Sequence, residues 1–374
     1  MRVAIFGGSF DPVHSEHVRL VQAAKEQLGL DKILVMPAGF APHKNGAVCS
    51  GKERAELLRI AFRRCPYVEV SEYELDAAGK SYSYLTCRWF EKQYPEAERY
   101  FLVGADMLEN FPAWKNPQDI LSRVRLAACG RASSEVDSLH ESFISQFGCD
   151  FVQFDFIGGE VSSTLVRTEL AFGKSPASLD LEVLAYVRVR GLYTHPAILP
   201  ALALEKEARR EHSFRVAKLS TARAKSAGVS EQKALLAAAL HDCAKYLPMN
   251  SPYLAGFTPP CGVPEPVMHQ YAGAYVAEHH FGIDDEEVLD AIRFHASGRE
   301  DMTTLGKLVY LADLLEEDRD FPHVEELRLL FWQDLDVCLE QSLAHQLDYL
   351  KGENKPVYPL TEAAYRWIKA KNTH

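Results

Sequence analysis

Two histidines, His14 and His17, stand three residues apart just after a glycine turn, and on a helix this spacing puts both on one face. The turn consists of Gly7, Gly8, Ser9 and Phe10 and follows an apolar run, 2–6, typical of a buried parallel strand. A strand, a glycine turn and a helix start together direct main-chain N–H groups and the positive end of the helix dipole toward an anion. Imidazole N–H groups there could donate to a phosphoryl oxygen, so the segment predicts a phosphate site.

Cations and hydroxyls suited to phosphate occur further along the first half of the chain. Lys44 follows the second predicted strand, and Arg167 stands one turn into a predicted helix that opens with Ser163 and Thr164. Hydroxyls and main-chain N–H groups at a helix start, with an arginine close behind, can hold an anion. Because the net charge is −11, a nucleotide site would need this local positive charge, to which Arg54 could add.

An aspartate and a tryptophan come after the fourth predicted strand of this half. Asp106 stands just past the strand end, where a carboxylate can hold a ribose hydroxyl or orient a metal-bound water. Trp114 follows at a short distance and could stack on a heteroaromatic ring. A lone tryptophan is more often a core residue, but the nearby Asp106 favours stacking. Ser83 and Thr86 add hydroxyls at the start of another predicted helix, where a plain helix cap explains part of the pattern.

Histidines and aspartates of a second kind of site are spread through the second half. They are His212, His241, Asp242, His269, His295 and Asp313. Each lies in a helical pattern beside small residues, where an unpaired imidazole or carboxylate would be costly to bury. Imidazole together with carboxylate suits iron, manganese or zinc with open positions for water, so the set predicts a metal centre. Asp242 could bridge two ions.

The elements that must position the first site alternate between strand and helix over residues 1–193. Predicted strands cover 2–6, 32–36, 67–70, 99–103, 124–128 and 150–154, and predicted helices lie near 13–29, 51–64, 83–93, 117–122, 136–147, 163–171 and 180–189. This alternation predicts an α/β fold with a doubly wound parallel sheet. Ligands of such sheets bind at the carboxyl ends of the strands, where the residues named above fall.

The second half changes character after a segment with one glycine and two prolines, 191–200. Helical periodicity then dominates over 201–227, 230–246, 265–281, 284–296, 303–317 and 323–351. The sequence therefore predicts two domains, an α/β domain over 1–195 and an all-α domain over 196–374.

Composition limits the classes of partner. The chain has 374 residues, of which 47% are hydrophobic, enough for two full cores. The net charge argues against a nucleic-acid or anionic-membrane binder. Eight scattered cysteines without a Cys-x-x-Cys pair suit free thiols in a reducing compartment, and the sequence shows neither a signal-type leader nor a membrane-spanning run. We expect a cytoplasmic protein, with a homo-oligomer left open.

The run from Gly7 to His17 resembles the nucleotidylyltransferase superfamily. The further segments named above narrow the resemblance of residues 1–193 to bacterial nicotinate-nucleotide adenylyltransferases. That family implies a Rossmann-like fold and transfer of the adenylyl group of ATP to nicotinate mononucleotide, helped by Mg²⁺, with deamido-NAD and pyrophosphate as products. The acceptor phosphate is already an anion, so catalysis consists of alignment and neutralisation of charge.

The same resemblance implies roles for the matching positions. His14 and His17 would be catalytic and bind the reacting phosphates. The substrate-binding set would comprise the turn Gly7, Gly8, Ser9 and Phe10, the triphosphate contacts Lys44, Ser163, Thr164 and Arg167, the nucleotide contact Asp106, and the nicotinate-side residues Ser83, Thr86 and Trp114. Two positions depart from the family pattern, since Glu16 replaces the usual Gly and Leu85 replaces a frequent Asp.

The adjacent pair His241 and Asp242 resembles the HD-domain phosphohydrolase superfamily. More narrowly, residues 203–370 resemble the bacterial HD family that cleaves diadenosine tetraphosphate into two ADP. That family implies a catalytic Asp242 and iron in a di-iron centre, or Mn²⁺. It also implies phosphate contacts from Lys245, Arg299 and Arg319. Ala296 departs from it, where Thr is usual.

We therefore expect a bifunctional enzyme, and alternatives stay open for both halves. The first half could adenylylate nicotinamide mononucleotide or another phosphate acceptor, such as a pantetheine phosphate. The second half could hydrolyse a different nucleotide, or could be a regulatory module that binds nucleotides without turnover.

Overall fold

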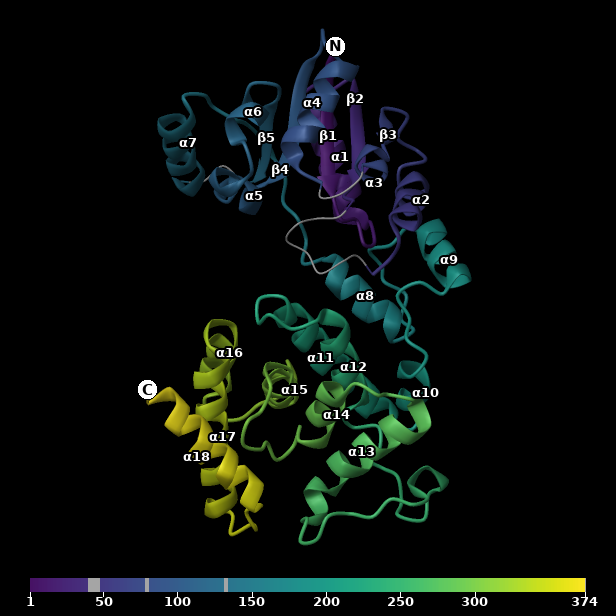
Figure 1. Ribbon diagram of the computed structural model, residues 1–374, viewed down its shortest axis with the longest axis vertical. Helices are drawn as coiled ribbons and strands as arrows, with labels where there is room; N and C mark the ends of the chain where they lie inside the picture. Colours follow the sequence, from purple (N-terminus) through teal and green to yellow (C-terminus); the bar gives the residue numbers. More distant parts are fainter. Residues whose placement is uncertain (40–47, 78–80, 131–133, 374) are drawn as a thin grey trace. The chain divides into compact units, whose positions relative to one another are not determined.

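The computed structural model describes residues 1–39, 48–77, 81–130 and 134–373, without the side chains of 105–106 and 134–138. The chain forms two compact units (Figure 1). The first comprises residues 1–167 and 175–193, and the second comprises residues 168–174 and 194–374. The domain limit after residue 195 stays a prediction, and the two units are described separately below.

A six-stranded parallel sheet forms the centre of the first unit, as predicted (Figure 1). Its strands are β1 (Arg2–Gly8), β2 (Lys32–Pro37), β3 (Val68–Val70), β4 (Glu98–Gly104), β5 (Arg125–Gly130) and β6 (Val152–Asp155). Their order is β3-β2-β1-β4-β5-β6, and every pairing is parallel. The order reverses direction between β1 and β4, so the carboxyl ends of these two strands form the switch point at which ligands bind in such sheets.

The central strand β1 is apolar because both faces of the sheet are covered. Val3, Ala4 and Ile5 are fully buried, and Ile5 pairs with Leu34 of β2 and Phe101 of β4. A strand of this kind shows a continuous apolar run instead of alternation, which is why the sequence reveals it.

The helices of the first unit largely follow the predicted pattern. They are α1 (Ser15–Gln27), α2 (Gly51–Ala61), α3 (Tyr73–Asp76), α4 (Ser83–Gln93), α5 (Ala105–Glu109), η1 (Phe111–Ala113), α6 (Pro117–Leu121), α7 (Ser134–Phe147), the first part of α8 (Ser163–Ala171) and α9 (Leu181–Arg190); the rest of α8, from Thr168, belongs to the second unit. The short elements α3, α5 and η1 were not predicted.

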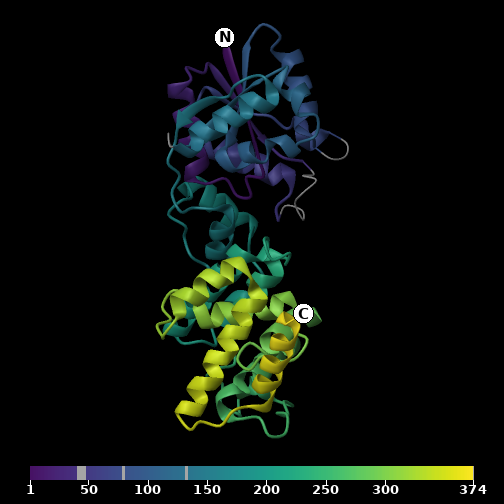
Figure 2. The ribbon, with the colours of Figure 1, turned by 90° about the vertical axis from the view of Figure 1, so that its left-hand side faces the viewer.

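All regular elements in the described part of the second unit are helices, which confirms the all-α prediction (Figure 1). Its helices are α10 (Ile198–Leu202), α11 (Glu207–Ala224), α12 (Glu231–Leu240), η2 (Pro252–Leu254), α13 (Glu265–Phe281), α14 (Glu286–Arg293), α15 (Thr304–Leu315), α16 (Val324–Gln333), α17 (Leu335–Gly352) and α18 (Pro359–Asn372). In Figure 2, α17 and α18 lie side by side, as they do in Figure 1.

One predicted helix, 323–351, is wrong as a single element. Asp334 interrupts it with an extended backbone, φ −146° and ψ 110°, and its carboxylate accepts hydrogen bonds from the N–H groups of Asp336 and Val337. This is a helix N-cap, so α17 starts anew there. The helix α18 was not predicted.

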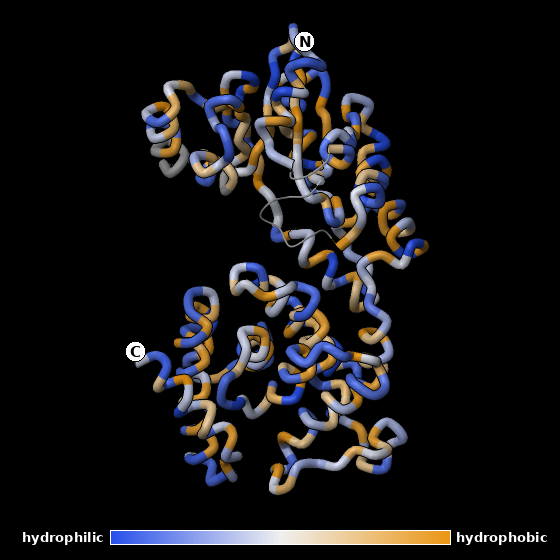
Figure 3. Tube along the Cα trace, viewed as in Figure 1, coloured by the Kyte–Doolittle hydropathy of each residue, from blue (hydrophilic) through white to orange (hydrophobic). Residues whose placement is uncertain are grey.

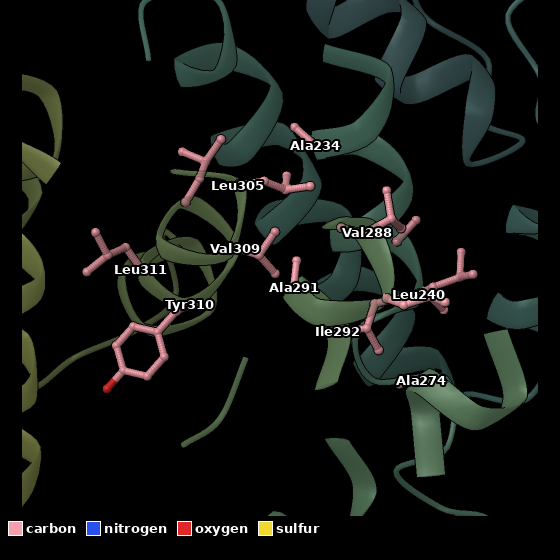
Figure 4. Close-up of a cluster of buried hydrophobic side chains, with 14 of the residues drawn as sticks. Ala234, Leu240, Ala274, Val288, Ala291, Ile292, Leu305, Val309, Tyr310 and Leu311 are labelled. Atoms are coloured by element: carbon pink, nitrogen blue, oxygen red, sulfur yellow. The ribbon is translucent and has the colours of Figure 1, made fainter. Parts of the chain in front are cut away.

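The core of the second unit lies between helices that the sequence separates widely. Side chains of α12, α14 and α15 converge in it, and Val309 of α15 points toward Ala291 of α14 (Figure 4). Apolar residues recur at intervals along these helices (Figure 3). None of the helices in the described ranges combines the length and the hydrophobicity that a membrane span requires.

Candidate active sites

His14 and His17 lie together at the positive end of α1, next to the carboxyl end of β1. His14 is the N-cap residue, one position before the helix, and the two ring centroids are 3.8 Å apart. The main-chain N–H of His14 donates to Nδ1 of His17 at 3.2 Å. Because an N–H group can only donate, this Nδ1 carries a lone pair, and neutral His17 bears its proton on Nε2. His17 is thereby held as a donor suited to a phosphoryl oxygen.

His14 is neutral at ordinary pH. Burial lowers its pKa to about 4, against the opposing effect of the Glu16 carboxylate. Its Nδ1 is buried and has no hydrogen-bond partner among the residues that the structure describes. An unpartnered polar atom at the switch point of the sheet is available to a ligand.

The glycine turn packs against His17 through the Phe10 ring. A Cβ on Gly8 would come within 2.9 Å of the Phe10 ring, so only glycine fits there. The buried Phe10 ring meets the His17 ring edge-on at 5.0 Å. At Gly7 the nearest atom to a Cβ would be 4.0 Å away, so this second glycine is not required by space.

Asp11 ties the turn to the rest of the first unit. Its carboxylate accepts hydrogen bonds from the N–H groups of Val48 and Cys49 at 2.7 and 3.3 Å and from the Tyr193 hydroxyl at 2.8 Å. Its main-chain carbonyl accepts one from Arg167. The sequence indicated only a turn at Asp11, because all four of these partners lie 37 or more residues away.

The start of α8 packs against the same turn. Ser163 Oγ donates to the carbonyl of Pro12 at 3.0 Å, and Arg167 donates to Thr164 Oγ1 at 3.0 Å as well as to Asp11. The predicted anion-binding residues at this helix start therefore lie beside the turn that carries the histidines. Their contact with phosphate remains a prediction.

Arg54 links two loops through hydrogen bonds, so its guanidinium is already engaged within the protein. It is almost fully buried, and its two Nη atoms donate to the carbonyls of Ser9 and Ala38 at 2.6 and 2.8 Å. These carbonyls follow β1 and β2, so Arg54 holds the ends of both strands in place.

The nicotinate-side residues are partly committed to local structure. Thr86 is buried and donates to Glu74 at 2.7 Å, while burial raises the pKa of that carboxyl. Ser83 is half-buried at the first position of α4. The contacts of Ser83 and Thr86 do not identify a substrate, so both roles stay predictions.

Trp114 is half-buried in an aromatic cluster. Its ring lies 5.9 Å from Phe101 and 5.3 Å from Phe111, in both cases tilted or edge-on. Stacking on a pyridine ring therefore remains a prediction. Lys44 and the Asp106 side chain lie outside the described part of the chain.

The six predicted metal ligands of the second unit come together from five segments. His212 lies on α11, His241 and Asp242 follow α12, His269 lies on α13, His295 follows α14 and Asp313 lies on α15. Two groups have ligand atoms within 4.8 Å of one another: His212, His241 and Asp313 form one, and His241, Asp242 and His295 form the other.

The distances between ligand atoms fit the edges of a coordination shell. His212 Nε2 lies 2.9 Å from an Asp313 oxygen, and Asp242 Oδ1 lies 3.2 Å from His269 Nε2 and 3.4 Å from His295 Nε2. Ligands about 2.1 Å from one ion are roughly 3 Å apart. In the described ranges, no well-aligned hydrogen bond reaches His212 Nε2, His241 Nε2 or either Asp242 oxygen, although Asp313 and Arg209 lie at ion-pair distances of 2.9 and 3.0 Å from His212 and Asp242. Buried lone-pair atoms of this kind can bind a cation.

Neighbouring groups orient the imidazoles. Nδ1 of His241 binds the carbonyl of Ala238 at 2.6 Å, and Nδ1 of His295 binds that of Ile292 at 2.8 Å. A carbonyl only accepts, so each Nδ1 bears a proton and each Nε2 faces the cluster. Burial lowers the pKa of His295 to about 4, which keeps it neutral.

The charges of the cluster are strongly coupled. Burial opposes ionisation of Asp242 and Asp313, but the surrounding histidines outweigh it and lower both carboxyl pKa values. Burial likewise opposes charge on His241, but Asp242 outweighs it and raises that pKa to about 9. The aspartates are thus ionised, as metal ligands must be.

Two of the three predicted phosphate contacts border this cluster. Lys245 Nζ lies 3.4 Å from Asp242 Oδ1, and Arg319 donates to Asp313 at 2.7 Å. Arg299 instead pairs with Asp290, so the structure gives it no direct link to the ligands. All three phosphate roles stay predictions.

Family comparisons match both units. Residues 5–169 match the cytidylyltransferase-like family, and residues 209–318 match the HD domain. A Gloeobacter violaceus protein named "Probable nicotinate-nucleotide adenylyltransferase" is 36% identical over 202 residues, which are 52% of this chain and 98% of that protein. The chain belongs to the nicotinate-nucleotide adenylyltransferase family. In this family member an HD domain follows the adenylyltransferase part.

A second relative spans both parts of this adenylyltransferase-family chain. A Mycoplasma pneumoniae protein named "Probable nicotinate-nucleotide adenylyltransferase/Ap4A hydrolase" is 29% identical over 319 residues, which are 84% of this chain and 88% of that protein. A solved Clostridium acetobutylicum protein described as a "predicted HD superfamily hydrolase involved in NAD metabolism" is 29% identical across 46% of this chain and 93% of that protein, with a TM-score of 0.41.

Two residues of the HD part of this adenylyltransferase-family chain contact predicted metal ligands although the sequence assigned them no role. Arg209 pairs with Asp242 at 3.0 Å, and Glu316 accepts a hydrogen bond from His212 Nδ1 at 3.0 Å. A signal for both existed in the sequence, since each stands three residues from a predicted ligand and so shares its helix face.

Proposed function

We propose that the first unit transfers the adenylyl group of ATP to nicotinate mononucleotide, and that the second hydrolyses diadenosine tetraphosphate to two ADP. For the first reaction, the observation that carries most weight is His17, held as an Nε2–H donor at the switch point of the sheet. For the second, it is the convergence of largely buried imidazole and carboxylate ligand atoms within 4.8 Å of one another. Family membership and the names of relatives support both assignments.

In the first reaction, a phosphate oxygen of nicotinate mononucleotide attacks the α-phosphorus of ATP. The bond from that phosphorus to the bridging oxygen breaks, and pyrophosphate leaves with the electron pair. No general base is needed, because the attacking oxygen is already an anion. His17 would donate its Nε2–H to a phosphoryl oxygen, a kind of contact whose loss typically costs about 10²–10³ in rate. His14 would present its Nδ1 to the same phosphates.

The other substrate contacts belong to this proposal. Ser163, Thr164 and Arg167 would bind the triphosphate from the start of α8, and Lys44 would add a charge. Asp106 would contact the nucleotide, and Trp114 the pyridine ring. Mg²⁺, when bound with ATP, would neutralise charge on the phosphoryl oxygens.

In the second unit, the two oxygens of Asp242 face different groups. Oδ1 lies against His269 and His295, whereas Oδ2 lies 3.5 Å from His241, which itself groups with His212 and Asp313. This arrangement supports two ions bridged by Asp242. Mixed imidazole and carboxylate ligands suit iron, as a di-iron centre, or Mn²⁺.

The protein residues of the second site have separable roles. Bound ions would supply Lewis acidity and lower the pKa of water. The four histidines and two aspartates would hold them, and Lys245, Arg299 and Arg319 would bind phosphates. An oxygen from water would attack phosphorus in line, and one ADP would leave as the bond to the bridging oxygen breaks.

One preparation of the full chain tests both activities. The acceptor test offers nicotinate mononucleotide, nicotinamide mononucleotide and a pantetheine phosphate with MgATP, and the proposal requires deamido-NAD as the main product. The second test incubates anaerobic, iron-loaded protein with diadenosine tetraphosphate. Two ADP support the proposal, and AMP plus ATP, or no turnover with metal bound, contradict it.

Location and assembly remain predictions. We expect a cytoplasmic protein that binds neither nucleic acid nor membrane. Light scattering coupled to size-exclusion chromatography tests whether it forms a homo-oligomer.

A further inference from the structure

Glu16 is the most conspicuous departure from the family pattern, because it puts a carboxylate two residues after His14 and one before His17. A negative charge that faced the histidines would repel the phosphates of ATP. Its orientation therefore decides whether it weakens the site.

The carboxylate of Glu16 binds the segment between β6 and α8. One carboxylate oxygen accepts a hydrogen bond from the main-chain N–H of Gly159 at 2.7 Å, and the other accepts one from Arg19 at 2.7 Å. The side chain is only 12% exposed. Burial raises its pKa, but the N–H group and Arg19 outweigh this effect and leave the pKa below its usual value. Glu16 is thus an ionised and fully engaged side chain.

Two further side chains of α1 hold the same segment. The Arg19 guanidinium lies over the Phe156 ring at 5.6 Å from its centroid. Gln27 exchanges two hydrogen bonds of 2.8 Å with the main chain of Asp155. At 100° per residue, Glu16, Arg19 and Gln27 fall on one side of the helix. One face of α1 therefore contacts residues 155–159 at three points, of which two are on the main chain and one is the Phe156 ring.

The segment leads directly into the helix start assigned to the triphosphate. Ser162, three residues after Gly159, accepts a hydrogen bond from the N–H of Leu165 and so caps α8. Ser163 then contacts the carbonyl of Pro12, next to the histidine turn. Where the segment sits consequently decides where the hydroxyls of α8 sit relative to His17.

We propose that Glu16 and Arg19 form a clasp that fixes residues 155–162 and thereby positions the start of α8 against the histidine turn. Glu16 is a positioning residue here, because it acts through the segment and not on the substrate. The clasp itself rests only on the contacts described above. Its kinetic consequence rests on the proposed adenylyl transfer.

The clasp and simple repulsion predict opposite changes in the affinity for ATP when Glu16 is removed. If Glu16 mainly repelled phosphate, its removal would tighten ATP binding. If it positions the segment, its removal loosens ATP binding and leaves the chemical step intact once ATP is bound, so KM rises while kcat holds.

The experiment compares E16A, E16Q and R19A with wild type in the full chain, with E26A as the matched control. Glu26 is an exposed carboxylate near the other end of α1. The first readout is hydrogen exchange of the peptide that contains the Gly159 amide. In E16A we expect about tenfold faster exchange there, the factor for roughly 1.4 kcal/mol of a charge-assisted hydrogen bond. E16Q keeps an acceptor oxygen and should stay within about threefold of wild type.

The second readout is steady-state adenylyl transfer. We expect E16A to raise the KM for ATP about three- to tenfold with kcat within about twofold, R19A to raise it less, and E16Q to restore most of the affinity. Exchange unchanged in E16A would overturn the clasp. Faster exchange with an unchanged or lower KM would overturn the positioning role.

The clasp and the proposed function fail in different ways. If wild type makes no deamido-NAD, the assignment of the reaction fails, yet the exchange readout still judges the clasp. Thermal unfolding identifies a variant that does not fold, and E16Q, which keeps the volume and an acceptor, then carries the exchange test.

Discussion

Glu316 gives the sharpest test of the metal centre, because it contacts no substrate in the proposed reaction. It is 2% exposed, and its Oε1 accepts the hydrogen bond from His212 Nδ1. Its Oε2 accepts one from Arg215 at 2.6 Å and one from the N–H of Asp318 at 2.9 Å. Three donors thus converge on one carboxylate, which fixes the ring of a predicted ligand.

The variant Glu316→Gln keeps the volume but replaces one acceptor oxygen by an NH₂ group. In one amide orientation this NH₂ faces the donors of Arg215 and Asp318, and in the other it faces His212 Nδ1–H. Either orientation loses at least one hydrogen bond to a charged group, about 1.5–3 kcal/mol. If His212 loses its fixed orientation, metal affinity should fall about 10- to 100-fold.

Competition with a chromophoric chelator measures the affinity for Mn²⁺ directly, without reference to turnover. Glu317→Gln is the matched control, since the neighbouring carboxylate is 58% exposed and pairs only with Lys218 among the described residues. It should leave the affinity within about twofold, as surface ion pairs contribute little. A folded Glu316→Gln protein whose Mn²⁺ affinity stays within about threefold of wild type would refute the reasoning.

Three further outcomes are expected. His17→Ala should lower adenylyl transfer about 10²–10³-fold and leave tetraphosphate hydrolysis intact, and Asp242→Ala should do the reverse; loss of both activities in one folded variant contradicts two independent sites. Gly8→Ala should destabilise the protein by about 1–3 kcal/mol, because its Cβ would press on an aromatic ring, while Gly7→Ala should cost less; equal shifts in thermal unfolding would contradict this. The His14 ring, with a pKa lowered to about 4 by burial, should show no NMR titration between pH 5 and 8, and acid should destabilise the fold between about pH 6.5 and 4, because only the unfolded state takes up that proton in this range.

The amino-acid sequence by itself determined the architecture and the chemistry-bearing residues. Buried parallel strands such as β1 are continuous apolar runs, and amphipathic helices carry a 3.6-residue period, so local pattern reveals both. The closely spaced histidines and the His241–Asp242 pair are likewise local features. Sequence reasoning therefore located the strand ends and the six metal-ligand candidates before their contacts were known.

Only the tertiary structure decided which groups those residues meet. Glu16 meets Gly159, which lies 143 positions away, and His212 meets Glu316, which lies 104 away. Arg54 on an apparently exposed helix face is buried between two loops, which no periodicity reveals. The physical reason is that orientation, burial and pKa depend on neighbours brought together by folding, and a single sequence does not specify those distances.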